Sequence, residues 1–190
     1  MKKIKIQIAL LVVLITLTSA FTLSLAPGKM FTKNGKVSFF SHTDMEDIKG
    51  DNNKVSSILD LKTGKIAIEI LVKSFVFKKA LMEEHFNENY MESSKFPKAK
   101  FDGKIDNLED INFTKDGTYK TQVSGNLTIK DKTNAVKTIG TFTVKGGKLN
   151  GKAKFNVAPA DYNIIIPSVV KEKIAKQIEI TVDLDYEAMK

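Results

Sequence analysis

The stretch YKTQVSGNLTI, residues 119–129, alternates apolar and polar side chains over an unusually long run. Tyr119, Val123, Leu127 and Ile129 share one face with two small residues, while lysine and amide side chains take the other. A period of two places successive side chains on opposite faces of a β-strand. The stretch therefore predicts a long strand with one apolar face and one wet face.

The segments on both sides of this strand repeat the pattern. In residues 65–73, for example, Lys65, Glu69 and Lys73 take the polar face. Period-two alternation in nearly all segments after Asn34 predicts an all-β protein. The residues that share the apolar faces of these other strands are Ile66, Ile68, Ile70 and Val72; Ala99 and Phe101; Val136, Thr138, Gly140, Phe142 and Val144; Leu149, Gly151, Ala153, Phe155 and Val157; and Ile178, Ile180, Val182, Leu184 and Tyr186.

Turn-forming residues separate the predicted strands. They stand at residues 62–64 (KTG), 116–117 (DG), 131–134 (DKTN) and 146–147 (GG). Glycine, asparagine and aspartate accept the backbone angles of tight turns, so most connections are expected to be hairpins.

Helical spacing replaces the alternation in two places. Within residues 79–92, Met82, Phe86 and Tyr90 recur every four residues, which predicts one amphipathic helix of about three turns. His85 lies beside this apolar stripe. Near the C-terminus, Pro167 and the residues up to 174 predict a short helical turn before the last strand.

Long strands that are apolar on one side only must cover that side. Two packed sheets or one sheet closed on itself both achieve this, so a sandwich and an up-and-down barrel satisfy the pattern. Uniform strand lengths and hairpin-sized connections favour the barrel. No repeat, low-complexity tract or linker divides the chain, and we expect one domain.

The N-terminal stretch has the features of an export signal. Lys2, Lys3 and Lys5 precede an apolar run from residue 6 to residue 17, and small residues follow up to Ala20. We expect cleavage after Ala20, so that residues 1–20 are the signal peptide, with a cut after Ala26 as the alternative. An uncleaved anchor is the rival interpretation, because apolar residues continue to Leu25 over roughly the ~20 positions that a bilayer span needs.

The composition restricts the possible chemistry. The chain has 190 residues, 42% hydrophobic and 27% charged, with no cysteine or tryptophan and a net charge of +8. The lack of cysteine excludes disulfides, thiolate nucleophiles and thiolate-held metal clusters. All 30 basic residues are lysines spread over the polar faces. Nucleic-acid binding favours clustered arginine and stacking aromatics, so we expect no nucleic-acid partner and only weak attraction to anionic lipid headgroups, a peripheral membrane contact.

Recognisable catalytic motifs are missing from the sequence, and we expect neither an enzyme, a cofactor nor a metal site. The two histidines, His42 and His85, lie on different elements. His42 is expected to be exposed at a strand end. The apolar face itself allows two interpretations, a fully packed core or a cavity lined by the same side chains.

One segment resembles the most recognisable stretch of the YceI-like family. The family has there a histidine, an aromatic pair that ends in an acid, and an aromatic-Pro-x-x-x-Phe step, and residues 85–101, HFNENYMESSKFPKAKF, resemble this order. Residues 123–129, VSGNLTI, are similar to the family's Gly-x-Leu-Thr-Ile strand. The opening at residues 37–40 and the ending at 178–186 fall where its first and last strands would. The similarity covers roughly residues 28–187, which we assign to a YceI-like β-barrel domain.

Two departures from the family's pattern are visible. Lys130-Asp131-Lys132 stands where the family often has His-Gly-Val, and Tyr90-Met91 replaces an aromatic pair. A fold transfers between relatives more safely than a ligand does.

The resemblance implies a periplasmic or secreted protein with an eight-stranded antiparallel, lipocalin-like barrel that holds a polyisoprenoid or similar amphiphilic lipid. The alternative is a ligand-free structural or stress-related interaction module of the envelope. Gly125, Gly140, Gly151 and Ala153 are expected to leave room inside. The mouth candidates are His85, Phe86 and Tyr90. The residues expected to line the cavity are Ile66, Ile68, Ile70, Val72, Phe101, Leu127, Ile129, Phe142, Val144, Ala153, Phe155, Ile180 and Val182.

Overall fold

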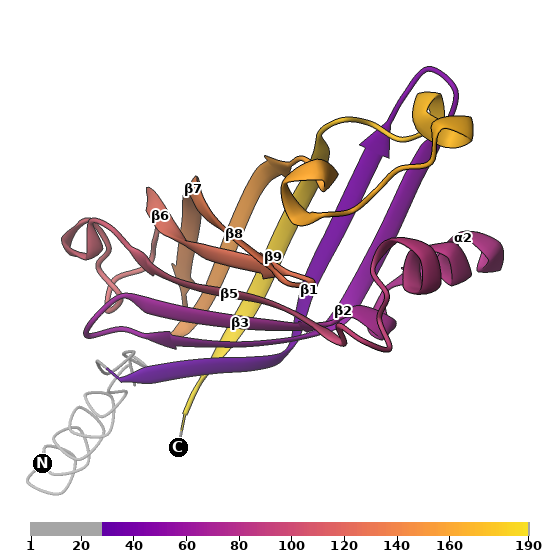
Figure 1. Cartoon of the computed structure of the whole chain (residues 1–190). Helices are drawn as coiled ribbons and strands as arrows, with labels where there is room; N and C mark the ends of the chain where they lie inside the picture. The colour runs from indigo at the N-terminus through magenta and orange to yellow at the C-terminus, as the bar shows by residue number, and fades with distance from the viewer. Residues whose placement is uncertain (1–27, 190) are drawn as a thin grey trace, which may run out of the picture.

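The computed structural model describes residues 28–189, and strands make up most of them. The long strands alternate buried and exposed side chains, as their sequences predict. Figure 1 follows them along the chain. The strands are β1 (Lys29–His42), β2 (Asp47–Asp60), β3 (Lys65–Leu71), β4 (Val76–Phe77), β5 (Lys98–Ile105), β6 (Gly117–Ile129), β7 (Lys132–Lys145), β8 (Lys148–Val157) and β9 (Ile178–Ala188).

Eight of these strands close into an antiparallel barrel. The order is β1-β9-β8-β7-β6-β5-β3-β2, and β2 pairs again with β1. The last pairing joins the first strand to the second from Lys29↔Asp60 to His42↔Asp47, with register shifts at Gly35. Closure leaves no second sheet, so the sandwich alternative is wrong and the predicted eight-stranded barrel is confirmed.

Strand β4 is an addition that the sequence pattern did not predict. Within the described residues it pairs with the N-terminal half of β2, at Gly50↔Phe77 and Asp51↔Val76. There β2 extends past the end of β3, so a short strand takes the place beside it. The barrel wall is therefore continued on this side beyond the end of β3.

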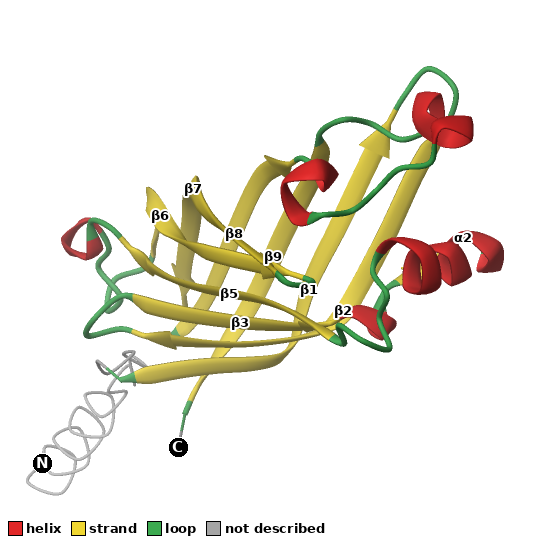
Figure 2. Cartoon of the chain, viewed as in Figure 1, coloured by secondary structure: helices red, strands yellow, loops and turns green. Residues whose placement is uncertain are grey.

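The predicted helix forms, but in two parts. The α-helix α2 (Ala80–His85) continues into a π-helical turn, η2 (Phe86–Tyr90). The C-terminal helical turn is the 3-10 helix η5 (Ser168–Lys173). Figure 2 shows these helical segments gathered mostly at one end of the barrel. The remaining short helices are η1 (Val72–Ser74), η3 (Leu108–Asp110) and η4 (Pro159–Tyr162).

The two ends of the barrel differ in packing. The end that holds the β2–β3 and β7–β8 turns is filled by fully buried side chains, among them Met30, Leu59 and Leu149. We call it the closed end. Ser57 Oγ donates to the Ala67 carbonyl oxygen (3.0 Å) and lies 2.8 Å from the Tyr186 hydroxyl, so the tyrosine is the donor in that pair. Burial raises the pKa of Tyr186 to about 12, which keeps this hydroxyl protonated.

The turns are mostly where they were predicted. Gly146 and Gly147 have φ of 56° and 73°, which β-carbon-bearing residues rarely adopt, and they join β7 to β8 in a two-residue turn. The turn predicted at residues 131–134 is wrong in position. Ile129 pairs with Lys132, so the turn is Lys130-Asp131. Lys130 takes a φ of 54° there without glycine's freedom.

Residues 1–20, predicted to be the export signal, lie outside the described residues. Among residues 28–189 no helix has the length and apolarity needed to cross a bilayer.

Candidate ligand cavity

A cavity of about 530 Å³ occupies the barrel interior above the closed end. Its lining comes from all eight barrel strands and is largely apolar. At its other end it reaches side chains of α2, of the β1–β2 connection and of residues 158–177, among them the exposed Leu81, His85 and Lys173. We call this end the mouth. In Figure 1 the last of these segments arches across one side of it, with α2 on the other.

Four phenylalanines build one wall of the cavity near the mouth. The Phe86 ring from η2 lies 5.3 Å from Phe39 of β1, 5.4 Å from Phe75 and 5.0 Å from Phe77, measured between ring centroids. Stacked, tilted and edge contacts of this kind stabilise more than area burial alone. They attach the helical segment to the barrel, and Met82, Phe86 and Tyr90 of this segment line the cavity.

The segment of residues 158–177 covers the opposite side. Ile164, Ile166, Val170 and Ile174 line the cavity from it. It is attached to the tip of β1 by the backbone N–H of Ala175, which donates to Ser41 Oγ at 2.9 Å. We call this segment the strap.

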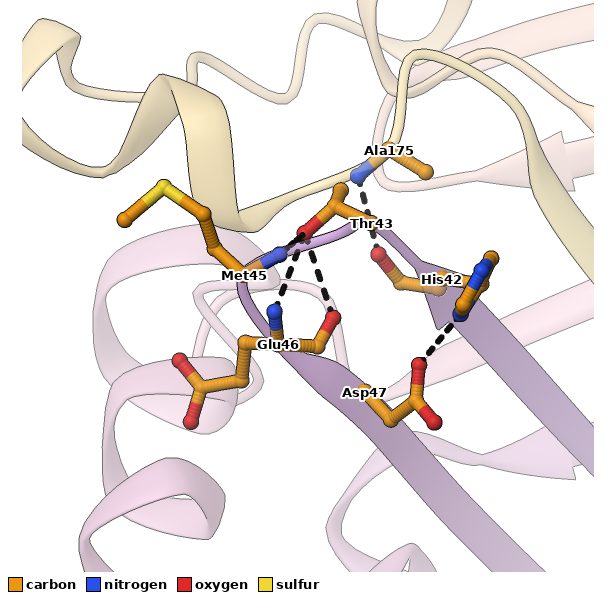
Figure 3. A network of polar contacts seen from close by, with 7 residues as sticks. His42, Thr43, Met45, Glu46, Asp47 and Ala175 are labelled. Carbon is orange, nitrogen blue, oxygen red and sulfur yellow. Dashed lines mark hydrogen bonds and ion pairs between the residues drawn. The ribbon is translucent and has the colours of Figure 1, made fainter.

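A polar network shapes the tip of the β1–β2 hairpin between the strap and α2, as Figure 3 shows. Thr43 Oγ1 accepts the backbone N–H of Met45 (3.3 Å) and of Glu46 (3.1 Å), which closes the turn. Asp47 lies 2.6 Å from the His42 ring and raises the pKa of His42 by this hydrogen bond and its charge. His42 is exposed at a strand end, as predicted. The turn therefore presents Met45 outward at the mouth.

Few charged groups border the cavity. Lys79 Nζ and Glu46 Oε1 form an ion pair at 3.1 Å, and Glu46 is the less exposed of the two side chains. The side chains of Tyr90 and Tyr162 also line the cavity, and burial raises the pKa of both, so they are neutral at pH 7. An occupant thus meets apolar walls in the interior and hydrogen-bonding groups near the mouth.

The residues expected to line the cavity do so, with one exception. Val144 is wrong: it is buried in the packed core beside the β7–β8 turn at the closed end. The mouth candidates His85, Phe86 and Tyr90 all border the cavity. The lining residues that sequence reasoning missed lie on β1, on β2, around β4 and in the strap; they include Val37, Phe39, Ile48, Phe75, Phe77, Ile164, Ile166, Val170 and Ile174.

The expectation that small residues leave room holds for only some of them. Gly140, Gly151 and Ala153 border the cavity. Gly125 does not, because the Phe101 ring covers it: a β-carbon there would lie 2.7 Å from Phe101 Cζ and 2.4 Å from Gly103 Cα. The expectation is therefore wrong at Gly125, where an aromatic ring from the same wall occupies the room.

The end of the helical segment is attached to the barrel by an ion pair between Glu92 and Lys130. The Lys130 side chain is only 8% exposed, and its ammonium also lies 5.7 Å from the Phe96 ring centroid. Both Glu92 and Lys130 have positive φ, a costly conformation for residues with side chains. The partners are 38 residues apart, so no local sequence pattern predicts the contact.

Metal-ligating side chains do not cluster in the described part of the chain. Within residues 28–189, no group of three or more histidine, aspartate or glutamate side chains could hold a metal ion. His42 is hydrogen-bonded to Asp47 alone among the side chains described, and the geometry does not join it to His85. What the site provides is an apolar cavity that opens at the mouth, where a few polar groups border it.

Several solved structures share the fold. A polyisoprenoid binding domain from Saccharophagus degradans, implicated in plant cell wall breakdown, has a TM-score of 0.75 at 12% identity, covering 86% of this chain and 100% of that chain. Burkholderia cenocepacia BcnA has a TM-score of 0.62 at 17% identity, covering 81% and 96%. The Campylobacter jejuni YCEI protein has a TM-score of 0.59 at 15% identity, covering 78% and 90%.

No curated protein matches the chain. The model of the YceI-like domain family matches residues 29–186, from the first strand of the barrel to the last. These bounds contain α2 and the whole eight-stranded barrel except the last two residues of β9, Glu187 and Ala188. The chain belongs to the YceI-like family.

Proposed function

We propose that the protein is an exported carrier that holds one long apolar or amphiphilic lipid, of the polyisoprenoid kind, inside the barrel. The observation that carries the proposal is the apolar cavity of about 530 Å³. Cavities of ~300–1,000 Å³ lined mainly by apolar and aromatic side chains are typical of small-ligand sites. The similar structure from S. degradans is a polyisoprenoid binding domain, which supports a polyisoprenoid-like lipid as the ligand.

Affinity would come from the tail and selectivity from the mouth. Burial of apolar chain contributes about 0.8 kcal/mol for each methylene group removed from water. The Lys79–Glu46 pair lines the cavity at the mouth, where a head group would lie. We propose binding rather than catalysis, because among the described residues that line the cavity no nucleophile is paired with a base.

Native mass spectrometry of protein purified from its own envelope tests the proposal. We expect an apolar mass that leaves when the protein is extracted with organic solvent. A clean unliganded mass, together with no uptake of added geranylgeraniol, would contradict lipid carriage and favour the structural or interaction module.

Filling the cavity should reduce binding without unfolding the barrel. Ala153 borders the cavity and pairs with Gly140 and Val182. In a packed core, added methylenes typically cost about 1–3 kcal/mol, whereas a cavity accepts them. Ala153→Leu should therefore leave the melting temperature of the delipidated protein nearly unchanged and lower the lipid extracted per protein.

The matched control for Ala153→Leu is Lys154→Leu on the same strand. Lys154 points outward, and its replacement removes only a surface ion pair with Glu179 at 2.8 Å. The lipid content of this variant should therefore stay at the wild-type level. If Ala153→Leu melts much lower and the wild type never yields a ligand, the interior at this position is a packed core.

Export is part of the proposal and rests on residues 1–20, with cleavage after Ala20 and delivery to a periplasm or the outside of the cell. Intact mass of the protein from the envelope tests it. We expect the mass of residues 21–190, or of 27–190 for the later cut. A mass that includes Met1, in a protein that stays with the membrane, would favour the anchor.

A further inference from the structure

Exposed apolar side chains gather around the mouth. Met45 at the β1–β2 tip is 64% exposed, Leu81 of α2 61%, and Ile165 and Val169 of the strap 83% and 87%. We call these four residues the mouth rim. Clusters of exposed apolar residues next to charged ones mark contact surfaces, whereas single ones do not. The rim comes from three separate elements, so its exposed apolar side chains are not the property of a single loop.

The strap is apolar on both sides. Ile164, Ile166 and Val170 face the cavity, while Ile165 and Val169, which alternate with them, face solvent. A segment that only covered a cavity would need the first set alone. The second set extends the apolar lining of the cavity outward, so that the interior and the rim form one continuous apolar path.

The charge beside Ile165 and Val169, the strap part of the rim, is positive, whereas acidic side chains flank Met45 and follow Leu81. After Val170 the strap carries three lysines, Lys171, Lys173 and Lys176, and one acid, Glu172. All three lysines are exposed, and none forms an ion pair within the part of the chain that the structure describes. Lysines that flank exposed apolar residues are attracted to anionic lipid headgroups while the apolar side chains enter the acyl boundary.

We propose that the mouth rim docks on an anionic lipid bilayer, with Ile165 and Val169 inserted and the strap lysines on the headgroups. The inference rests on the proposed function, because it provides the path by which a lipid enters or leaves the cavity. In this orientation the tail passes from bilayer to barrel without crossing water, and the closed end points away from the membrane.

A chain without cysteine allows a local test. Val169→Cys is labelled with an environment-sensitive nitrobenzoxadiazole, and Thr63→Cys, at the β2–β3 turn of the closed end, is the matched control. Each protein, purified from the envelope, is mixed with vesicles of phosphatidylcholine alone or with phosphatidylglycerol. We expect a blue shift, and quenching by a spin-labelled lipid, only for the label at 169 and only with phosphatidylglycerol.

Other results would overturn the proposal. An unchanged emission at 169 with both vesicles would leave a protein partner as the occupant of the rim. An emission change at 169 that appears without lipid as protein concentration rises would assign the rim to a second copy of the chain. Equal shifts at 169 and 63, or a shift at 63 alone, would contradict the orientation.

A second arm separates this inference from lipid carriage. The double variant Ile165→Glu, Val169→Glu changes only exposed side chains and should melt like the wild type. It should bind geranylgeraniol delivered from ethanol as the wild type does, but take up several-fold less from phosphatidylglycerol vesicles. Equal uptake from vesicles would overturn rim docking. Failure of the wild type to bind geranylgeraniol from ethanol would instead contradict lipid carriage, whatever the label at 169 reports.

Discussion

Gly125→Ala should destabilise the protein by about 3 kcal/mol, the upper end of what overpacking usually costs. A β-carbon at this position would lie 2.4 Å from Gly103 Cα and 2.5 Å from the Asp102 carbonyl oxygen. Both obstacles are backbone atoms of β5, the neighbouring strand, and cannot turn aside as a side chain can. The change should appear as a lower midpoint in urea unfolding followed by circular dichroism.

Gly151→Ala is the matched control. A β-carbon there meets nothing closer than 3.4 Å, the Phe142 ring, and position 151 borders the cavity. We expect its stability to stay within about 1 kcal/mol of wild type, since glycine replacement at a compatible site mainly restricts the unfolded chain. Equal losses for the two variants would show that the contact with β5 does not decide the cost.

Leu59→Ala should cost more stability than Phe155→Ala, although phenylalanine loses more atoms. Leu59 is 0% exposed in the packed closed end, where a leucine truncation costs about 2–5 kcal/mol through lost burial and a new void. Phe155 is half-buried and already faces the cavity, so its removal enlarges a space that exists. The usual order of cost by side-chain size is therefore expected to reverse.

Unfolding of both variants in urea, after delipidation, measures this difference. Repeating the measurement with geranylgeraniol present adds a second comparison, because ligand that binds only the folded protein raises stability. The ligand should stabilise Leu59→Ala about as much as wild type, and Phe155→Ala less. A greater loss for Phe155→Ala in the delipidated state would mean that the interior is packed throughout.

Alternation predicts which way a side chain points, but not how deep in the barrel it lies. Ile68 and Phe142 border the cavity because a strand has a period of two. Val144 follows the same period and yet belongs to the closed end, two residues nearer the β7–β8 turn. Depth depends on how the strands are staggered around the barrel, and this follows from pairings that a single strand does not show.

The mouth was the least predictable part for a related reason. Ile164 and Ile166 lie in an irregular segment, where no period indicates a face. Likewise Lys130 at a tight turn contradicts the usual turn chemistry, and its partner Glu92 is distant in the sequence. The helix was predicted by its four-residue spacing, but its attachment through Phe39 and Phe77 depends on contacts between separate strands.

The course of β1 decides which way a tethered barrel would face. Lys29 pairs with Asp60 at the closed end, and His42 pairs with Asp47 at the mouth. Over 14 residues, at about 3.3 Å per residue, the strand spans up to about 45 Å. A barrel held in a membrane by its N-terminal segment would thus have its closed end near that membrane. Its mouth would point away, toward any surface about 45 Å further out. A barrel freed from this segment, as we propose for export, would not be held in that orientation.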